Sequence, residues 1–112
     1  MQEFEKLKQN YEFRRLYSKG TVMVAPAFVL YAKKGKPSRL RFGITVSKKL
    51  GGAVKRNRAK RVLYAAFCEC EKDIPRGYDF VAVARHRSLL QKSTEIALSM
   101  RNELIKAGFI KE

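Results

Sequence analysis

Apolar residues recur along this chain with two different periods, one typical of strands and one typical of helices. Residues 40–46 are apolar at every second position, which predicts a strand with one buried face. Residues 59–70 instead carry apolar side chains three and four positions apart, which predicts the buried stripe of a long helix over about residues 53–71. The residues of that stripe are Ala59, Val62, Leu63, Ala66, Phe67 and Cys70.

The remaining pattern predicts two more helices and three more strands. We expect a short helix over about residues 11–19, and a last helix that starts near Ser88 or Ser93 and ends at residue 107. Segments 21–25, 28–31 and 78–84 are rich in residues that favour strands. The order helix, three strands, helix, strand, helix predicts one α+β domain over residues 1–112. Its expected architecture is an α-β sandwich with helices packed against a four-stranded sheet.

Positive charge gathers in the middle of the chain. Fifteen of the 25 Lys and Arg residues lie between Phe13 and Cys68, a stretch with no Asp or Glu. The two flanks, residues 1–12 and 69–112, carry ten basic and ten acidic residues, so the net charge of +15 belongs to the central stretch. A surface made for solubility mixes both signs, whereas segregated charge is typical of proteins that bind a polyanion. The partner is therefore nucleic acid or, as the alternative, an acidic membrane.

The densest basic run is residues 47–61, Ser-Lys-Lys-Leu-Gly-Gly-Ala-Val-Lys-Arg-Asn-Arg-Ala-Lys-Arg. Arg binds a phosphate through two parallel hydrogen bonds and Lys acts as a point charge, so this mixture suits a phosphate backbone. Asn57 adds a donor and an acceptor that charge alone would not require. We predict a nucleic-acid-binding surface made of Lys48, Lys49, Lys55, Arg56, Asn57, Arg58, Lys60 and Arg61.

A run of charge can also be an ordinary solvated helix face. Such a face usually pairs Glu with Lys four residues apart, whereas this one repeats like charge, which destabilises an isolated helix. On a helical wheel Asn57, Lys60, Arg61 and Tyr64 fall opposite the apolar stripe. The pattern therefore favours nucleic-acid binding over the solvated face.

Three aromatic residues form a second candidate surface. Phe13 and Tyr17 are one helical turn apart, and Tyr31 ends a predicted strand. These rings could belong to the core. If they line a groove beside the basic helix, they could instead be platforms on which unpaired bases stack. The residues alone leave both readings open.

Few residues of this chain could perform chemistry. Asp73 and Asp79 are the only aspartates and have no obvious metal-binding neighbour, and His86 is the only histidine. Cys68 and Cys70 should point to different faces of a helix, which suits neither a mutual disulfide nor a zinc site. We expect no catalytic residue and no metal site in the chain.

The N-terminal segment and the apolar runs bear on where the protein works. No apolar run approaches the roughly 20 residues that span a bilayer. The first residues include acids and no apolar segment of the kind found in signal peptides. We therefore expect a cytoplasmic protein.

The central run resembles a known family. The segments Arg41-Phe-Gly-Ile-Thr-Val-Ser-Lys-Lys-Leu-Gly51, Ala53-Val54 and Arg56-Asn-Arg-Ala-Lys-Arg61 closely resemble the bacterial ribonuclease P protein component. The string Arg-Asn-Arg-x-Lys-Arg is the signature of that family. Phe28-Val-Leu-Tyr31 and Ala84-Arg85 also match family positions, so the resemblance covers most of the chain.

The resemblance implies a subunit of a ribonucleoprotein that removes the 5′ leader from precursor tRNA. In that family the RNA component, with Mg²⁺, carries out the hydrolysis. The implied partners are ribonuclease P RNA and precursor tRNA, with no membrane and no obligate protein partner. The basic surface would bind the catalytic RNA, and Phe13, Tyr17 and Tyr31 would line a cleft between helix and sheet that holds the single-stranded leader. The resemblance also implies a left-handed βαβ crossover, against the usual hand.

The chain departs from the family pattern just after the signature. Leu63 is followed by Tyr64-Ala65, where the family usually continues with an Arg-Glu or Arg-Gln pair. One basic contact on the helix is therefore absent, and Tyr64 could stack against RNA there instead.

Three other functions stay as alternatives. A structural rRNA-binding protein of the ribosomal type would share this composition and fold class, and only the specific motif argues against it. A nuclease acting alone is disfavoured by the scarcity of carboxylates. A membrane-surface role is weaker because the basic helix places no broad apolar face beside its charge.

Overall fold

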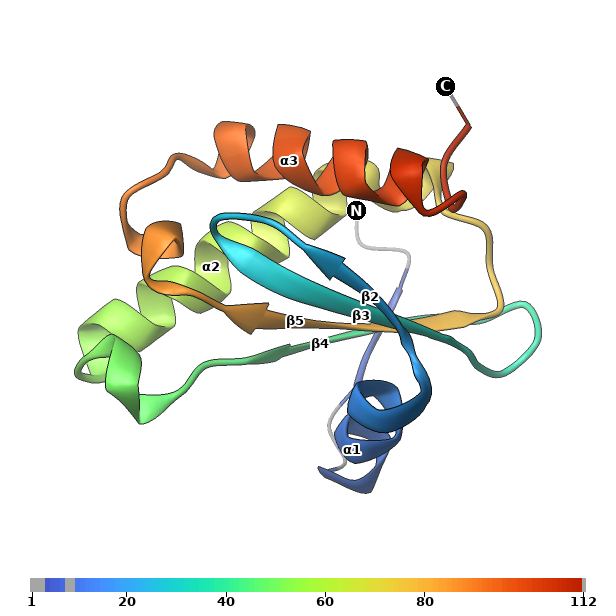
Figure 1. Ribbon diagram of the computed structural model, residues 1–112, viewed down its shortest axis with the longest axis horizontal. Helices are drawn as coiled ribbons and strands as arrows, with labels where there is room; N and C mark the ends of the chain where they lie inside the picture. Colours follow the sequence, from blue (N-terminus) through green and yellow to red (C-terminus); the bar gives the residue numbers. More distant parts are fainter. Residues whose placement is uncertain (1–3, 8–9, 112) are drawn as a thin grey trace.

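A computed structural model describes residues 4–7 and 10–111 as three helices and five strands (Figure 1). In chain order these are β1 (Glu5–Lys6), α1 (Asn10–Lys19), β2 (Thr21–Val24), β3 (Phe28–Lys34), β4 (Leu40–Thr45), α2 (Ala53–Cys70), β5 (Tyr78–Ala84) and α3 (Ser93–Lys106). Three short 3-10 turns also occur: η1 (Lys48–Leu50), η2 (Glu71–Asp73) and η3 (His86–Leu89).

The sheet has five strands, so the expectation of four was wrong. Its strand order is β1-β4-β5-β3-β2. The added strand, β1, runs parallel to β4 at the edge of the sheet, and the Leu7 amide donates a 2.9 Å hydrogen bond to the Phe42 carbonyl. Pattern reasoning missed β1 because two polar residues between Phe4 and Leu7 show no alternation.

The centre of the sheet is a parallel pair. β4 and β5 lie side by side and parallel, and α2 connects them, because parallel neighbours need a long crossover. β3 runs antiparallel to β5, and β2 antiparallel to β3. β3 extends beyond the predicted residue 31 because Lys33 and Lys34 pair with Asp79 and Tyr78 of β5, although their side chains are charged.

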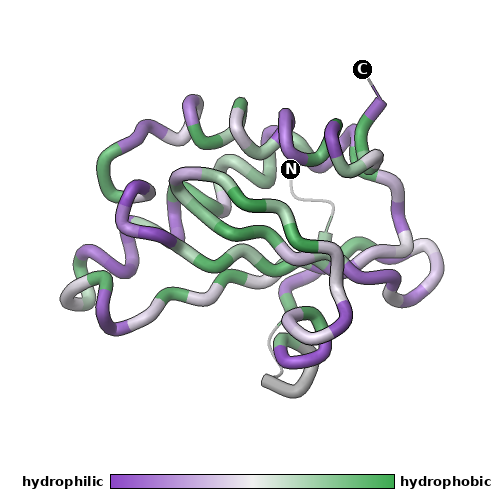
Figure 2. Tube along the Cα trace, viewed as in Figure 1, coloured by the Kyte–Doolittle hydropathy of each residue, from purple (hydrophilic) through white to green (hydrophobic). Residues whose placement is uncertain are grey.

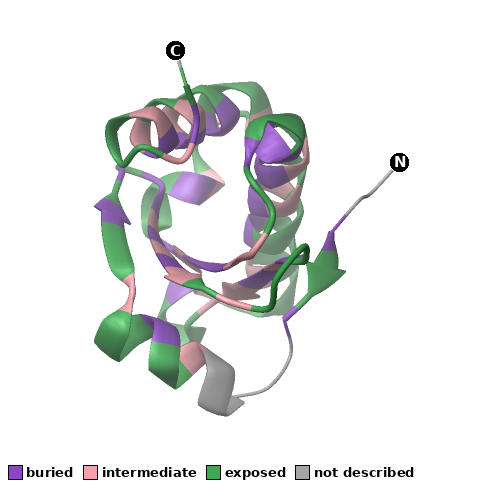
Figure 3. Cartoon of the chain, turned by 90° about the vertical axis from the view of Figure 1, so that its right-hand side faces the viewer, coloured by how far each residue is buried: buried purple, intermediate pink, exposed green. Residues whose placement is uncertain are grey.

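The main core lies between the sheet and helices α2 and α3, which cover the same face (Figures 1 and 3). Phe67 of α2 is fully buried and stacks flat on Phe42 of β4, with ring centroids 3.9 Å apart and planes 4° apart. It also meets Phe4 and Phe80 at centroid distances of 5.0 and 5.7 Å. Phe67 therefore joins α2 to the centre and to the edge of the sheet.

Helix α1 covers the opposite face of the sheet (Figure 1), and a smaller core of Leu7, Leu16 and Val81 lies beneath it. Tyr31 and Gly43 are the partners of Val81 on its two neighbouring strands. A Cβ atom on Gly43 would lie 2.5 Å from the Phe13 ring, so only glycine lets α1 approach this closely.

Replacing Phe67 with alanine should remove the attachment of α2 to the sheet. We expect Phe67→Ala to lower the free energy of unfolding by about 3–5 kcal/mol in urea titrations, as for other buried aromatic residues. The matched control is Leu98→Ala on α3, whose side chain is 62% exposed and should matter by less than about 0.5 kcal/mol. Equal effects of the two substitutions would contradict this account of the core.

Candidate nucleic-acid interface

The segment between β4 and α2 presents two lysines on a short, anchored turn. Lys48 and Lys49 are exposed in η1, while Leu50 is buried and fixes the turn to the core. The Ser47 hydroxyl accepts a 3.1 Å hydrogen bond from the Lys49 amide. Gly51 follows with a φ of 137°, in the left-handed region that favours glycine. The backbone that carries Lys48 and Lys49 therefore has a defined conformation.

Helix α2 continues this positive surface. Its buried positions are Ala59, Leu63, Ala66, Phe67 and Cys70, which confirms the predicted stripe except at Val62, which is half-buried. The predicted contact residues Lys55, Asn57, Arg58, Lys60 and Arg61 are all exposed. Arg56 differs, because it is half-buried and its Nε atom is buried without a hydrogen-bond partner.

The cations of α2 are not neutralised by acidic neighbours. The first turn of the helix contains no acid, although the positive end of the helix dipole favours one there. The ion pairs found among the described side chains, those of residues 4–7 and 13–111, involve Arg39, Arg41, Arg76, Arg101 and Lys106, and none of these belongs to α2. The charge on α2 is therefore available to an external anion.

Tyr64 does not lie on the open face that the helical wheel predicted. It is half-buried, and its ring packs against Phe4 at a centroid distance of 5.5 Å. The Lys6 ammonium lies 5.7 Å from the centre of the same ring. The N-terminal segment, whose strand the pattern did not reveal, therefore covers this part of α2.

Sequence reasoning left a further basic group out of the surface. Arg85, His86 and Arg87 are exposed, and η3, which includes His86 and Arg87, contacts α2. The Arg85 guanidinium donates a 3.0 Å hydrogen bond to the Ala25 carbonyl. The run Arg-His-Arg was visible in the sequence, but only the tertiary fold places it against α2.

The three predicted aromatic residues come together, but on the face of the sheet opposite α2. Phe13 and Tyr31 are half-buried against the small core under α1. Tyr17 is 38% exposed, and its ring stands edge-on to the Tyr31 ring with the centroids 5.0 Å apart. The Tyr17 hydroxyl shares a 2.8 Å hydrogen bond with the Thr45 hydroxyl. The sheet therefore lies between these rings and α2, and their use as a stacking platform stays a prediction.

An apolar strip of the sheet continues from these rings. Val22 pairs with Tyr31, and Val24 pairs with Val29, so their side chains share the face on which α1 lies. Val22 and Val24 are 51% and 58% exposed. Val29 and Val83 are half-buried. We call Tyr17, Tyr31, Val22, Val24, Val29 and Val83 the aromatic strip; it begins beside Thr45, three residues before the basic turn.

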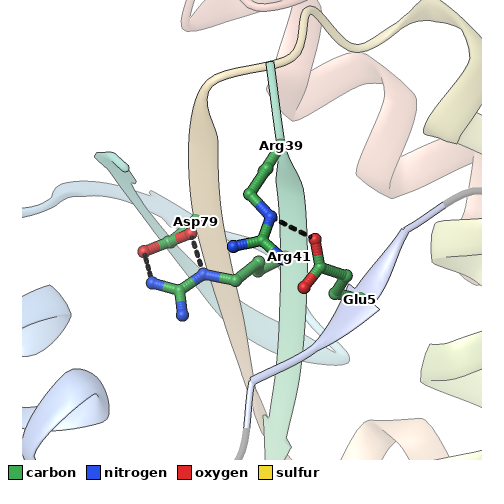
Figure 4. Close-up of polar contacts among 4 residues, drawn as sticks. All are labelled: Glu5, Arg39, Arg41 and Asp79. Atoms are coloured by element: carbon green, nitrogen blue, oxygen red, sulfur yellow. Dashed lines mark hydrogen bonds and ion pairs between the residues drawn. The ribbon is translucent and has the colours of Figure 1, made fainter. Parts of the chain in front are cut away.

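A second group of cations lies at the other end of the sheet, around the β3–β4 turn. There a hollow of about 510 Å³ is lined by Arg15, Lys33, Lys34, Lys36 and Arg41 among others. The Arg41 guanidinium donates hydrogen bonds of 2.9 and 2.7 Å to the Asp79 carboxylate, and Arg39 forms an ion pair with Glu5 (Figure 4). Figure 2 shows hydrophilic segments at both ends of a largely apolar sheet.

The described titratable residues include no group of metal ligands and no thiol with a lowered pKa. Among the side chains that the structure describes, those of residues 4–7 and 13–111, no three from His, Cys, Asp or Glu are grouped so that they could hold a metal ion. Burial raises the pKa of Cys70 to about 11 and also raises the pKa of Cys68, so both thiols are protonated at neutral pH.

No helix in the described part of the chain is long and apolar enough to cross a membrane.

Comparisons with known proteins give a consistent result. The family profile described as Ribonuclease P matches residues 1–108. The ribonuclease P protein component of Shouchella clausii is 38% identical to the chain, over 96% of this chain and 88% of the relative. That of Oceanobacillus iheyensis is also 38% identical, over 99% of this chain and 93% of the relative.

Solved structures agree with these relatives. The Staphylococcus aureus RNase P protein superposes with a TM-score of 0.80 at 33% identity, over 95% of this chain and 97% of that one. The Thermotoga maritima RNase P protein superposes with a TM-score of 0.69 at 27% identity, over 92% and 94%.

Removing a single cation from α2 should be visible in the salt dependence of RNA binding. We expect Arg58→Ala or Arg61→Ala to weaken binding and to reduce the slope of log K against log salt by roughly 0.7–0.9, the effect of one lost phosphate contact. Filter binding at several KCl concentrations measures both quantities.

The control for charge alone is Lys72→Ala, which removes an exposed cation from η2, after the C-terminal end of α2. Its slope should equal that of the unmodified chain. If Arg58→Ala and Arg61→Ala also leave the slope unchanged, neither residue contacts a phosphate.

Proposed function

Because the chain belongs to the ribonuclease P protein family, we propose that it is the protein subunit of a bacterial ribonuclease P. In this role it binds the catalytic RNA and the 5′ leader of precursor tRNA, and it assists removal of the leader. The catalytic RNA carries out the hydrolysis, and this chain contributes binding and charge.

One observation carries the RNA-binding part of the proposal. The turn η1 and the first turns of α2 carry a run of mostly exposed cations, and Arg56 is the half-buried exception; no acidic residue lies among them. Buried Leu50 and the buried stripe of α2 hold that surface in place. A preorganised array of this kind suits the closely spaced phosphates of a folded RNA.

The net charge of the chain explains how a subunit without catalytic residues could assist cleavage. The catalytic RNA and its precursor tRNA are both polyanions and repel each other, and cations between them lower this repulsion. A protein with a net charge of +15 would therefore reduce the Mg²⁺ concentration that assembly needs.

The aromatic strip is the site that we assign to the leader. An unpaired strand has exposed bases, and these stack on aromatic side chains with little sequence preference. Tyr17 is the most exposed ring of the predicted cleft, and the adjoining valines provide an apolar floor. Lys48 and Lys49 follow closely after Thr45, the hydrogen-bond partner of Tyr17. Cations that could bind the phosphates of the leader therefore follow closely in the chain after the stacking surface.

The described side chains do not fit a metal site, so no metal-dependent step is assigned to this chain. Mg²⁺ belongs to the RNA component, where it would support the hydrolysis of the phosphodiester bond.

Reconstitution tests the proposal. A bacterial ribonuclease P RNA is incubated with precursor tRNA at a low Mg²⁺ concentration, with and without the chain, and release of the leader is followed on a gel. We expect no cleavage by the chain alone, and restored cleavage when RNA and chain are combined. The double variant Arg58→Ala/Arg61→Ala should need more protein or more Mg²⁺ for the same rate.

Two results would contradict the proposal. Tight RNA binding without rescue of cleavage would favour the alternative of a structural rRNA-binding protein. Cleavage by the chain without any RNA component would show a nuclease that acts alone.

A further inference from the structure

A hollow at the edge of the sheet, distinct from the aromatic strip, combines an apolar floor with a positive rim. It lies between β1, β4 and α2, and its volume is about 630 Å³, within the range of small-molecule sites. Leu7, Phe42 and Ile44 contribute apolar surface. The rim consists of Lys6, Lys60 and Arg61, and Tyr64 forms part of the wall.

We propose that this hollow binds one unpaired nucleotide of the catalytic RNA, with its base stacked on Tyr64 and its phosphates at Lys60 and Arg61. The inference rests on the proposed function, because it deepens the RNA-binding role of α2. It adds a single base-binding site to a surface whose cations suit the phosphate backbone.

The lining matches both parts of a nucleotide. No acidic residue is among the described residues that line the hollow, and its three cations are exposed, so a phosphate can approach without repulsion. A free inorganic anion would leave the apolar floor unused, and an uncharged apolar ligand would leave the cations unused. A nucleotide presents a flat base and a charged backbone together, and it therefore satisfies both sets of residues.

The Lys6 side chain lies over the Tyr64 ring, and both residues line the hollow. The Lys6 ammonium is 5.7 Å from the ring centre, and Lys6 is exposed. Stacking of a base on an aromatic ring is stronger than a solvent-exposed cation–π contact. An incoming base would therefore displace Lys6 from the ring, and its ammonium would move to a phosphate of the bound nucleotide.

Packing around Tyr64 holds the ring in place for this task. Phe4 contacts it at a centroid distance of 5.5 Å with an interplanar angle of 50°, and Phe4 itself is buried against Phe67. The ring is thus ordered before RNA arrives, which reduces the entropy lost on binding. Tyr64 lies on α2, and Figure 1 shows α2 and α1 on opposite faces of the sheet.

The test compares Tyr64→Leu, Tyr64→Phe and the unmodified chain for binding to ribonuclease P RNA in the absence of tRNA. Leucine keeps apolar volume but cannot stack, and we expect it to weaken binding by about fivefold to a hundredfold. The factor should be the same at every salt concentration, because no cation is lost. Tyr64→Phe retains the ring and should bind within about twofold of the unmodified chain.

A matched control and a direct probe make the result independent of folding effects. Tyr78→Leu changes another half-buried tyrosine, one that lines neither hollow, and should leave the affinity unchanged. The chain contains no tryptophan, so Tyr64→Trp introduces a single indole at the site. We expect its fluorescence to be quenched when the RNA is added, as a base stacks on the indole.

Two outcomes would overturn the proposal: an affinity of Tyr64→Leu equal to that of the unmodified chain, or no quenching in RNA-bound Tyr64→Trp. Equal losses for Tyr64→Leu and Tyr78→Leu would also overturn it, because the effect would then be structural. Failure of the unmodified chain to bind the RNA would instead refute the proposed function itself.

Discussion

The packing of Phe67 on the sheet is the interaction on which the rest of this molecule depends. Helix α2 carries like charges in its first turns and has no acid at its positive N-terminal end, and both features destabilise a helix by a few tenths of a kcal/mol each. Burial of Phe67 or Leu63 contributes about 1.5–3 kcal/mol per side chain. The apolar face therefore outweighs the repulsion on the polar face, and α2 can present an unneutralised array of cations to RNA.

The sheet then determines how the binding surfaces are arranged. Helix α2 lies on one face and α1 with the aromatic strip on the other, and the hollow lined by Tyr64 lies at the edge of the sheet. Gly43 permits α1 to approach the sheet, and the hydrogen bond between Tyr17 and Thr45 ties α1 to the end of β4. The basic turn starts only a few residues later, so a single strand connects the surface that we assign to the leader with the surface that we assign to the catalytic RNA.

Features with a clear local cause were predictable from the sequence. The helical period revealed the stripe of α2, and the alternation of residues 40–46 revealed β4. The short strand β1 was missed because it is a strand only through its pairing with β4. Its own residues show no strand pattern. Tyr64 was assigned to the open face for the same reason, since the wheel of one helix cannot show that Phe4 and Lys6 cover it. The left-handed crossover stays a prediction from the resemblance.

The separation of two RNA-binding surfaces on one chain is tested most directly by comparing substrates with and without a leader. The measurement is the affinity of the assembled holoenzyme for precursor tRNA and for mature tRNA, with Tyr17→Ala in place of the unmodified chain. We expect Tyr17→Ala to weaken precursor binding by about 1–3 kcal/mol, the value of one stacked base, and to leave mature tRNA binding unchanged. Tyr17→Phe, which lacks the hydroxyl but keeps the ring, should behave like the unmodified chain. Equal losses for both substrates would contradict the assignment of the aromatic strip to the leader.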